Sequence, residues 1–187
     1  MSKLETPRLI LEPLSSAHQD SLLRLHNDPL VRDMFYGGEP QTAEHVQAMV
    51  DKCLLHWRNN GLGIWIVYRK TDSGTNLIGR CGLRAVDGTN YLELNYAFGQ
   101  AGVGQGLGPE AARAAITHAL THSNAEKVVA FVAHWNDRAK RAAEKLGLRY
   151  IDDRYRYQKL WGYYEMTREE YLSQSHYDLA VMRRPEE

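Results

Sequence analysis

Leu92-Glu93-Leu94-Asn95-Tyr96-Ala97-Phe98 is followed a few residues later by Gly104-Gln105-Gly106-Leu107-Gly108-Pro109-Glu110, and together these stretches decide the fold. The first alternates apolar and polar residues, as a strand does. In the second, alternating glycines let backbone N–H groups approach a ligand closely, and Pro109 suits the first position of a helix. The segment therefore predicts a strand, a glycine turn and a helix whose N-terminus binds a phosphate group.

The spacing of residues in this loop does not match either of two common phosphate-binding motifs. A Walker loop ends in Gly-Lys-Ser or Gly-Lys-Thr, whereas Gly108 is followed by Pro109 and Glu110. A dinucleotide fingerprint needs a third glycine where Leu107 or Pro109 stands. The loop therefore indicates neither ATP bound in that way nor a nicotinamide cofactor.

The rest of the chain alternates helices and strands, which predicts an α/β or α+β fold. The expected elements share clear apolar periodicity and turn signals. We expect strands at 9–14, 63–68, 77–83, 91–98, 127–133, 149–159 and 162–166, and helices at 18–25, 42–58, 109–121 and 137–146. Thr167 to Glu170 resembles a capping box opening a final short helix.

Three motifs resemble the GCN5-related N-acetyltransferase (GNAT) superfamily. Residues 103–108 are similar to its acetyl-CoA loop, Gln/Arg-x-x-Gly-x-Gly/Ala, with Val103 departing from the pattern. Residues 6–14 and 104–111 resemble the branch that acetylates N-termini of ribosomal proteins, the RimJ/RimL type. Residues 136–148 are similar to its Asn-x-x-Ser followed by Glu-Lys-Leu-Gly-Phe. The three motifs occur in the family's order and span nearly the whole chain.

The resemblance implies one mixed, mostly antiparallel sheet, flanked by helices and splayed where acetyl-CoA binds. It also implies an asparagine, here Asn136, that holds the pantetheine amides, although Asn136 is equally well placed to cap a helix. Lys140 and Arg141 could reach the CoA phosphates or be solvated charges on a helix face. The cofactor-binding residues that we expect are Tyr96, Ala97, Phe98, Val103, Gly104, Gln105, Gly106, Leu107, Gly108, Asn136 and Lys140.

Acetyl transfer to an amine needs a base, because a free amine is largely protonated at neutral pH. Glu93 stands where the branch places a strand glutamate, and it shares the polar face of its strand with Asn95. We expect Glu93 to be the general base; otherwise it is a solvated residue on an outer face. Backbone N–H groups near Tyr96 to Phe98 could polarise the acetyl carbonyl.

The proton donor is less plain from the sequence. Many family members carry a tyrosine where this chain has Ala143, and the branch's serine is replaced by Ala139. The nearest candidate hydroxyls are those of Tyr163 and Tyr164. Alternatively, the departing thiolate takes its proton from water.

Composition restricts the class of protein. The chain has 187 residues and a formal net charge of zero, which indicates neither a nucleic-acid partner nor an anionic membrane partner. It has no apolar signal core and two cysteines, so we expect a cytoplasmic protein without a disulfide framework or metal site. We expect one domain over 1–187, with 174–187 either an ordered extension or a frayed tail, in a monomer or homodimer.

These observations favour an acetyl-CoA-dependent N-acetyltransferase acting on a primary amine. The acceptor is either a protein or peptide N-terminus or a small amine, because fold-level resemblance transfers substrate poorly. The alternative is a catalytically weak acyl-CoA-binding module that acts through partner recognition. The replacements at Val103, Ala139 and Ala143 are what keep this alternative open.

Overall fold

A mixed sheet of eight strands forms the centre of the computed structural model, which describes residues 2–156 and 158–174. The strand order is β1-β2-β3-β4-β5-β6-β8-β7. The strands are β1 (Leu4–Glu5), β2 (Leu9–Pro13), β3 (Ile64–Thr71), β4 (Gly74–Ala85), β5 (Tyr91–Phe98), β6 (Lys127–Val132), β7 (Arg149–Arg156) and β8 (Lys159–Thr167). The helices are α1 (Gln19–His26), α2 (Pro29–Tyr36), α3 (Ala43–Asn60), α4 (Leu107–His122), α5 (Asp137–Lys145) and α6 (Arg168–Leu172), with short 3₁₀ turns at Ser16–His18 and Gln100–Gly102.

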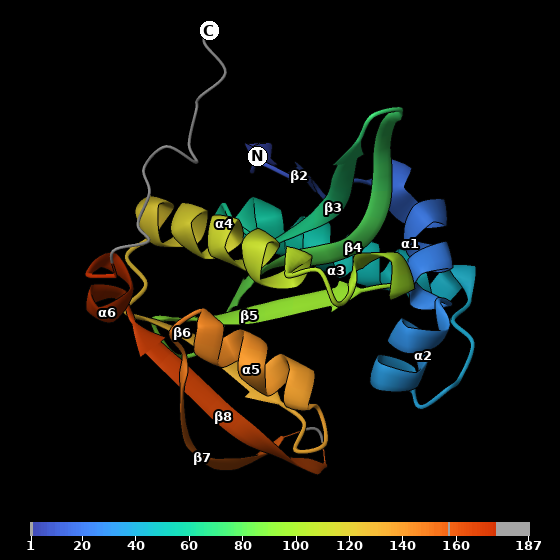
Figure 1. The fold of residues 1–187 in the computed structure, drawn as a ribbon. Helices are drawn as coiled ribbons and strands as arrows, with labels where there is room; N and C mark the ends of the chain where they lie inside the picture. Colours follow the sequence, from blue (N-terminus) through green and yellow to red (C-terminus); the bar gives the residue numbers. More distant parts are fainter. Residues whose placement is uncertain (1, 157, 175–187) are drawn as a thin grey trace, which may run out of the picture.

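The sheet is mostly antiparallel, as expected. Strands β1 to β5 form an antiparallel meander, and β6, β8 and β7 form a second antiparallel group. The two groups are joined by β5 and β6, which run parallel because α4 makes a crossover between them. Figure 1 shows α4 lying across the sheet above β5, with α5 beside β6.

The sheet parts between β5 and β6. These strands pair at only three positions, ending at Glu93↔Val129. Beyond that point β5 stays paired with β4 as far as Phe98↔Gly79, and β6 stays paired with β8 as far as Val132↔Gly162. The expected splay is therefore present, and it exposes the backbone of residues 94–98 on the side that faces β6.

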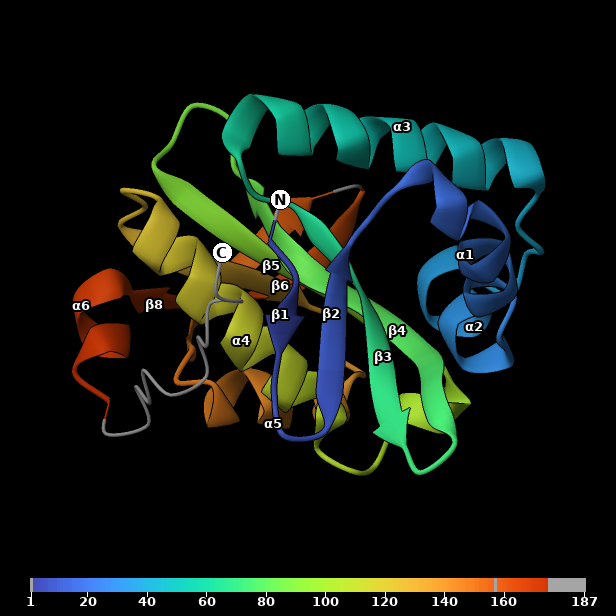
Figure 2. The same cartoon turned by 90° about the horizontal axis from the view of Figure 1, so that it is seen from above.

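Helices cover the sheet on both faces. Helices α4 and α5 pack on one face, whereas α1, α2 and α3 pack on the other, with α3 crossing the sheet in Figure 2. Strand β5 divides its side chains as alternation predicts: Leu92, Leu94 and Phe98 belong to the core beneath α4, and Ala97 belongs to the core beneath α1 and α3. The face that carries Glu93 and Asn95 is thus the face of α1 to α3.

The structure corrects several boundaries. Helix α4 begins at Leu107 with Gly106 as its N-cap, so Pro109 occupies the third helical position rather than the first. Proline is tolerated there because the N–H groups of the first turn have no partner within the helix. Helix α2 was not expected at all, and of the tail at 174–187 only Gln174 lies within the described residues. Every described helix is too short or too polar to span a bilayer.

Candidate active site

The glycine loop and the fork in the sheet enclose an outer cavity of about 320 Å³. Eight of the residues expected to bind the cofactor line this outer cavity: Tyr96, Ala97, Phe98, Val103, Gly104, Gly106, Gly108 and Asn136. Three basic side chains on α5, those of Arg138, Arg141 and Lys145, line it as well. A cavity of this size with a cationic rim suits a ligand that carries phosphate groups.

The loop has the backbone that an anion cradle requires. Gly104 and Gly106 have φ angles of +82° and +75°, in the region that favours glycine. They turn the chain so that the first N–H groups of α4 are left without helical partners, at the positive end of the helix dipole. Arg8 Nη1 donates to the Gln105 carbonyl at 3.0 Å, which fixes the loop from its outer side.

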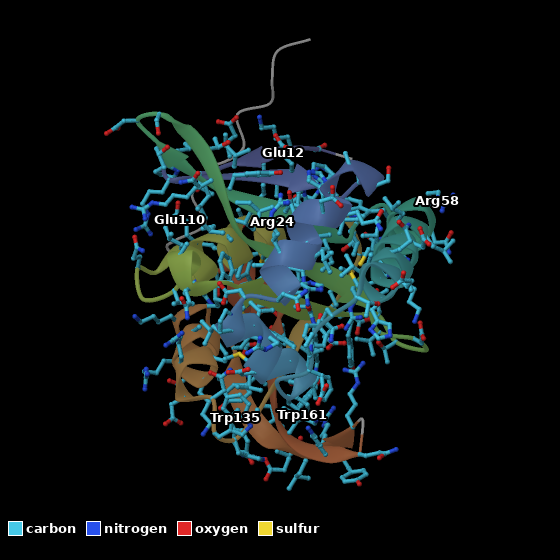
Figure 3. All side chains as sticks on the ribbon, turned by 90° about the vertical axis from the view of Figure 1, so that its right-hand side faces the viewer. Glu12, Arg24, Arg58, Glu110, Trp135 and Trp161 are labelled. Carbon is cyan, nitrogen blue, oxygen red and sulfur yellow. The ribbon has the colours of Figure 1, made fainter. Side chains whose placement is uncertain are left out.

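An inner cavity of about 130 Å³ continues from the outer one into the gap between β5 and β6. The two cavities share Met34, Phe35, Tyr96, Asn136 and Ala139, so they meet at these residues. Leu94 and Asn95 of β5 line it, as do Trp135 and Trp161. Figure 3 shows these two tryptophans together below α2.

Asn136 performs the capping role that its position suggested. Its Oδ1 accepts from the Ala139 N–H at 3.0 Å, which makes Asn136 the N-cap of α5. The same side chain lines both cavities, and Nδ2 lies 3.3 Å from Met34 Sδ, which is a weak acceptor. The amide group therefore has donor capacity facing the cavities.

Three residues expected to bind the cofactor do not line either cavity. Leu107 is buried in the core beneath α4, and Gln105 meets Arg8 through its backbone carbonyl. Lys140 forms an ion pair with Asp137 at 3.1 Å on the surface of α5. Arg138 and Lys145, which the sequence did not single out, line the outer cavity in the place expected for Lys140.

Glu93 is nearly buried, with 7% of its surface exposed, and it is ion-paired. Arg156 Nη1 donates to Oε2 at 2.9 Å, and Arg84 Nη2 lies 3.6 Å from Oε1. Glu93 lines a third hollow, of about 340 Å³, that opens beside His56 of α3 rather than into the inner cavity. Two guanidinium groups thus contact this carboxylate, two residues from Asn95.

The structure places the two phenols expected as proton donors away from both cavities. Tyr163 donates to Glu165 Oε2 at 3.2 Å, with Arg154 stacked on its ring, and Tyr164 packs edge-on against Tyr150. Neither lines the inner or the outer cavity. Tyr96 lines both, and it carries the one hydroxyl side chain among the described residues of either lining. Burial and the nearby Cys81 raise the pKa of Tyr96 to about 12, so its hydroxyl stays protonated.

Arg80 was not singled out from the sequence, although it is a charged residue in an otherwise small and apolar run, Leu77 to Leu83. It lies in β4 with 9% of its surface exposed. Its Nε donates to His26 Nε2 at 3.2 Å and its Nη1 donates to Asn95 Oδ1 at 2.6 Å. Burial, with a smaller contribution from Arg80, lowers the pKa of His26 to about 3, so His26 is neutral.

His118 and His122 do not form a metal site. Their rings stack with centroids 4.2 Å apart, and burial lowers the pKa of His118 to about 4. No group of three metal-ligating side chains occurs among residues 2–156 and 158–174.

Comparison with known proteins finds a family and relatives that this chain resembles. The family model described as "Acetyltransferase (GNAT) domain" matches residues 8–149. An uncharacterised protein, YkkB of Bacillus subtilis, is 29% identical over 159 residues, which cover 80% of this chain and 86% of YkkB.

Two solved structures share the fold. RimL, a ribosomal L7/L12 alpha-N-protein acetyltransferase in complex with coenzyme A, superposes with a TM-score of 0.77 at 12% identity, over 89% of this chain and 98% of its own. An acetyltransferase from Agrobacterium tumefaciens gives a TM-score of 0.71 at 23% identity, over 89% and 94% of the two chains. The likeness at these identities shows the fold, whereas the family match covers most of the sequence. The chain therefore belongs to the GNAT family of acetyltransferases.

Proposed function

We propose that this protein transfers the acetyl group of acetyl-CoA to the nitrogen of a primary amine. The observation that carries the proposal is the junction of the two cavities at Tyr96 and Asn136, directly beside the unpaired edge of β5. A phosphate-binding loop at one end and a small, mostly apolar chamber at the other suit a long donor whose reactive end is a thioester.

The residues of the outer cavity fit the donor's polar portion. Backbone N–H groups at the start of α4 would hold the pyrophosphate, and Arg138, Arg141 and Lys145 would neutralise its charge. The unpaired backbone of residues 94–98 and the amide of Asn136 would bond the pantetheine amides. When bound, acetyl-CoA supplies an activated acyl group on a good leaving thiolate.

The chemistry asks three things of this chain. Glu93 accepts the proton of the incoming amine, directly or through water, so that the nitrogen attacks as a neutral group. Backbone N–H groups of residues 96–98 stabilise the carbonyl oxygen as the C–N bond forms. Tyr96, rather than Tyr163 or Tyr164, donates a hydrogen bond to the sulfur as the C–S bond breaks, and the amine's surplus proton ends on the thiol.

A catalytically weak acyl-CoA-binding module is the second candidate, and one observation favours it. Glu93 is ion-paired with both Arg84 and Arg156, and it lines the third hollow rather than the inner cavity. In this second role Glu93 anchors Arg156 of β7 to β5 and contributes rigidity, not proton transfer.

Mass-spectrometric detection of acetyl transfer tests the proposal. The acceptor panel contains N-terminal peptides, amino acids, polyamines and aminoglycosides, each with acetyl-CoA, with and without the protein. A gain of one acetyl group that depends on the protein establishes the activity and ranks acceptor classes. Binding of acetyl-CoA without transfer to any amine would favour the binding module.

A further inference from the structure

Arg80 is a buried cation for which the described residues supply no anion. Its two hydrogen-bond partners, His26 and Asn95, are neutral, and none of the described carboxylates forms an ion pair with it. Removing a guanidinium from water without a counter-charge is costly. A bound anion would offset that cost.

The guanidinium has donors to spare. Of its five N–H groups, one on Nε serves His26 and one on Nη1 serves Asn95. The remaining hydrogens, on Nη1 and Nη2, form a fork that matches the two oxygens of a carboxylate. The Phe35 ring lies beside the guanidinium, with its centroid 5.7 Å from Cζ, and contributes no hydrogen-bond acceptor.

The orientation of Arg80 is fixed by a hydrogen-bond chain. Since His26 Nε2 accepts from Arg80, the ring proton lies on Nδ1, which is 3.0 Å from the Tyr36 hydroxyl. Arg80 is therefore clamped between α1 and β5, with α2 behind His26. Such clamping keeps the fork aimed in one direction, as a binding group requires.

Arg80 lies directly behind the wall that an acceptor amine must approach. Asn95 and Phe35, which touch it, both line the inner cavity. Across the β4–β5 ladder Arg80 pairs with Ala97, whose neighbour Tyr96 stands where the two cavities meet. Directly paired residues have Cβ atoms about 5 Å apart, so the Arg80 side chain begins beside Ala97, one residue from Tyr96.

We propose that Arg80 binds a carboxylate of the amine acceptor, which makes the acceptor an amino acid. The assignment rests on the proposed function, and it selects an amine that also carries a carboxylate. Phe131, Trp135 and Trp161 in the walls of the inner cavity favour an apolar side chain. A polyamine is disfavoured, because its cations would meet Arg80, and the N-terminal amine of a peptide has an amide where the carboxylate is needed.

The test compares acceptors that differ only in this group. We would assay two pairs of acceptors, leucine with leucinamide and phenylalanine with phenylalaninamide, and quantify the acetylated products. The proteins compared are the wild type, Arg80→Gln, Arg80→Lys and Arg24→Gln. Arg24 is an exposed arginine on α1 that serves as a matched control (Figure 3). Affinity for CoA verifies that each variant is folded.

The expected result is a preference of about 10- to 100-fold in kcat/KM for the free acid, the range for a hydrogen bond to a charged group. Arg80→Gln brings the ratio of acid to amide close to one and leaves the amide rate within a few-fold, Arg80→Lys gives an intermediate ratio, and Arg24→Gln keeps the full preference. Equal rates for acid and amide in the wild type would overturn the assignment. So would an Arg80→Gln defect that is equal for both, because that indicates a structural role.

A binding measurement separates this inference from the proposed function. N-acetyl-leucine and N-acetyl-leucinamide are titrated into the protein–CoA complex by calorimetry, which needs no turnover. Tighter binding of the acid that depends on Arg80 supports the carboxylate site even if no amine is acetylated. A lack of acetylation in that case would count against the proposed acetyl transfer and not against the carboxylate site. Equal binding of the two ligands would overturn the carboxylate site, and preferential acetylation of a leucyl peptide would assign the acceptor to N-termini instead.

Discussion

Arg8 and Glu110 meet although 102 residues separate them, with Arg8 Nε donating to Glu110 Oε2 at 2.7 Å. The hydroxyl of Thr6 donates to the other oxygen of Glu110, and Arg8 also holds the carbonyl of Gln105. The segment before β2 therefore braces the first turn of α4 and the glycine loop together. This contact joins the N-terminal motif and the loop motif in space.

Glu110→Gln is expected to loosen this brace. Because the Arg8 side chain is half exposed, we expect a loss of only about 1 kcal/mol in the free energy of unfolding. Affinity for CoA should fall about three- to tenfold, since the loop loses its support. Thermal unfolding and calorimetry measure the two effects. Glu169→Gln, on the exposed side of α6, is the matched control, and an unchanged CoA affinity in Glu110→Gln would show that the loop holds itself.

Gly108→Ala should separate ligand binding from stability. Gly108 is helical, and an added Cβ would lie 3.6 Å from the Phe98 ring, an ordinary contact. The substitution should therefore keep the stability or raise it by up to about 1 kcal/mol. Its methyl group projects toward the outer cavity, so CoA affinity should fall. Gly106→Ala is the contrast, because its φ of +75° makes alanine costly by about 1 kcal/mol although no atom is in the way. Equal CoA affinity in Gly108→Ala and the wild type would remove the outer cavity as the donor site.

Glu93→Gln distinguishes a base from an anchor. A general base contributes about 10²- to 10⁴-fold, so kcat should fall by at least about 100-fold while CoA affinity stays within a few-fold. Steady-state kinetics over pH 6 to 9 measure the loss. Arg84→Gln removes only the 3.6 Å contact and serves as the comparison variant. If Glu93→Gln keeps its turnover but unfolds at a lower temperature, Glu93 is a structural anchor.

Tyr96→Phe removes the hydroxyl of a residue that lines both cavities. We expect kcat to fall about 10- to 100-fold, less than for an oxyanion donor because a thiolate leaves readily. Since the pKa of Tyr96 is about 12, the hydroxyl is protonated at every accessible pH, and the loss should be constant from pH 6 to 9. The pKa of the bound CoA thiol, measured from its alkylation rate, should rise in the variant. A larger defect in Tyr163→Phe or Tyr164→Phe would move the proton donor to that residue.

His26 should make the protein less stable in acid. The unfolded chain protonates this histidine near its ordinary pKa of 6.5, whereas the folded protein does so only near 3. The unfolded state therefore binds more protons between these values, and the free energy of unfolding falls as the pH drops below about 6.5. His26→Asn should reduce that slope by roughly 1.4 kcal/mol per pH unit. Urea denaturation at pH 7.5, 6.5, 5.5 and 5.0 measures it, with His45→Asn as the exposed control; identical slopes in all three proteins would refute the assignment.

Local patterns predicted the elements that surround the site. Strand β5, the glycine turn and α4 follow from alternation and from residues whose preferences are strong within a few positions. Asn136 caps α5 and Thr167 forms a capping box with Glu170, because a cap depends on neighbours in the sequence. Helix α2 was missed although a signal existed: Asp28 caps it and Pro29 fills its first position.

Contacts between distant segments were not predictable in this way. The sequence identified Glu93 as a carboxylate on a polar face, but Arg156, which neutralises it, comes from 63 residues away. In the sequence Arg80 is a single charge in an apolar strand. Its hydrogen bond to His26 forms only because α1 lies over β4. Tyr96 was assigned a backbone role because alternation cannot tell which side chains of a strand border a gap.

The fork between β5 and β6 also gives the sheet strand edges in its interior. Open edges invite pairing with other chains, and proteins blunt them with charge or cover. One of the two outer edges, β7, carries five charged residues: Arg149, Asp152, Asp153, Arg154 and Arg156. The inner edge of β5 bears Leu94, Tyr96 and Phe98, and Met34 and Phe35 of α2 line the two cavities beside it. Helix α2 thus shields with apolar side chains an edge that, under the proposed function, has to stay uncharged to bond the donor.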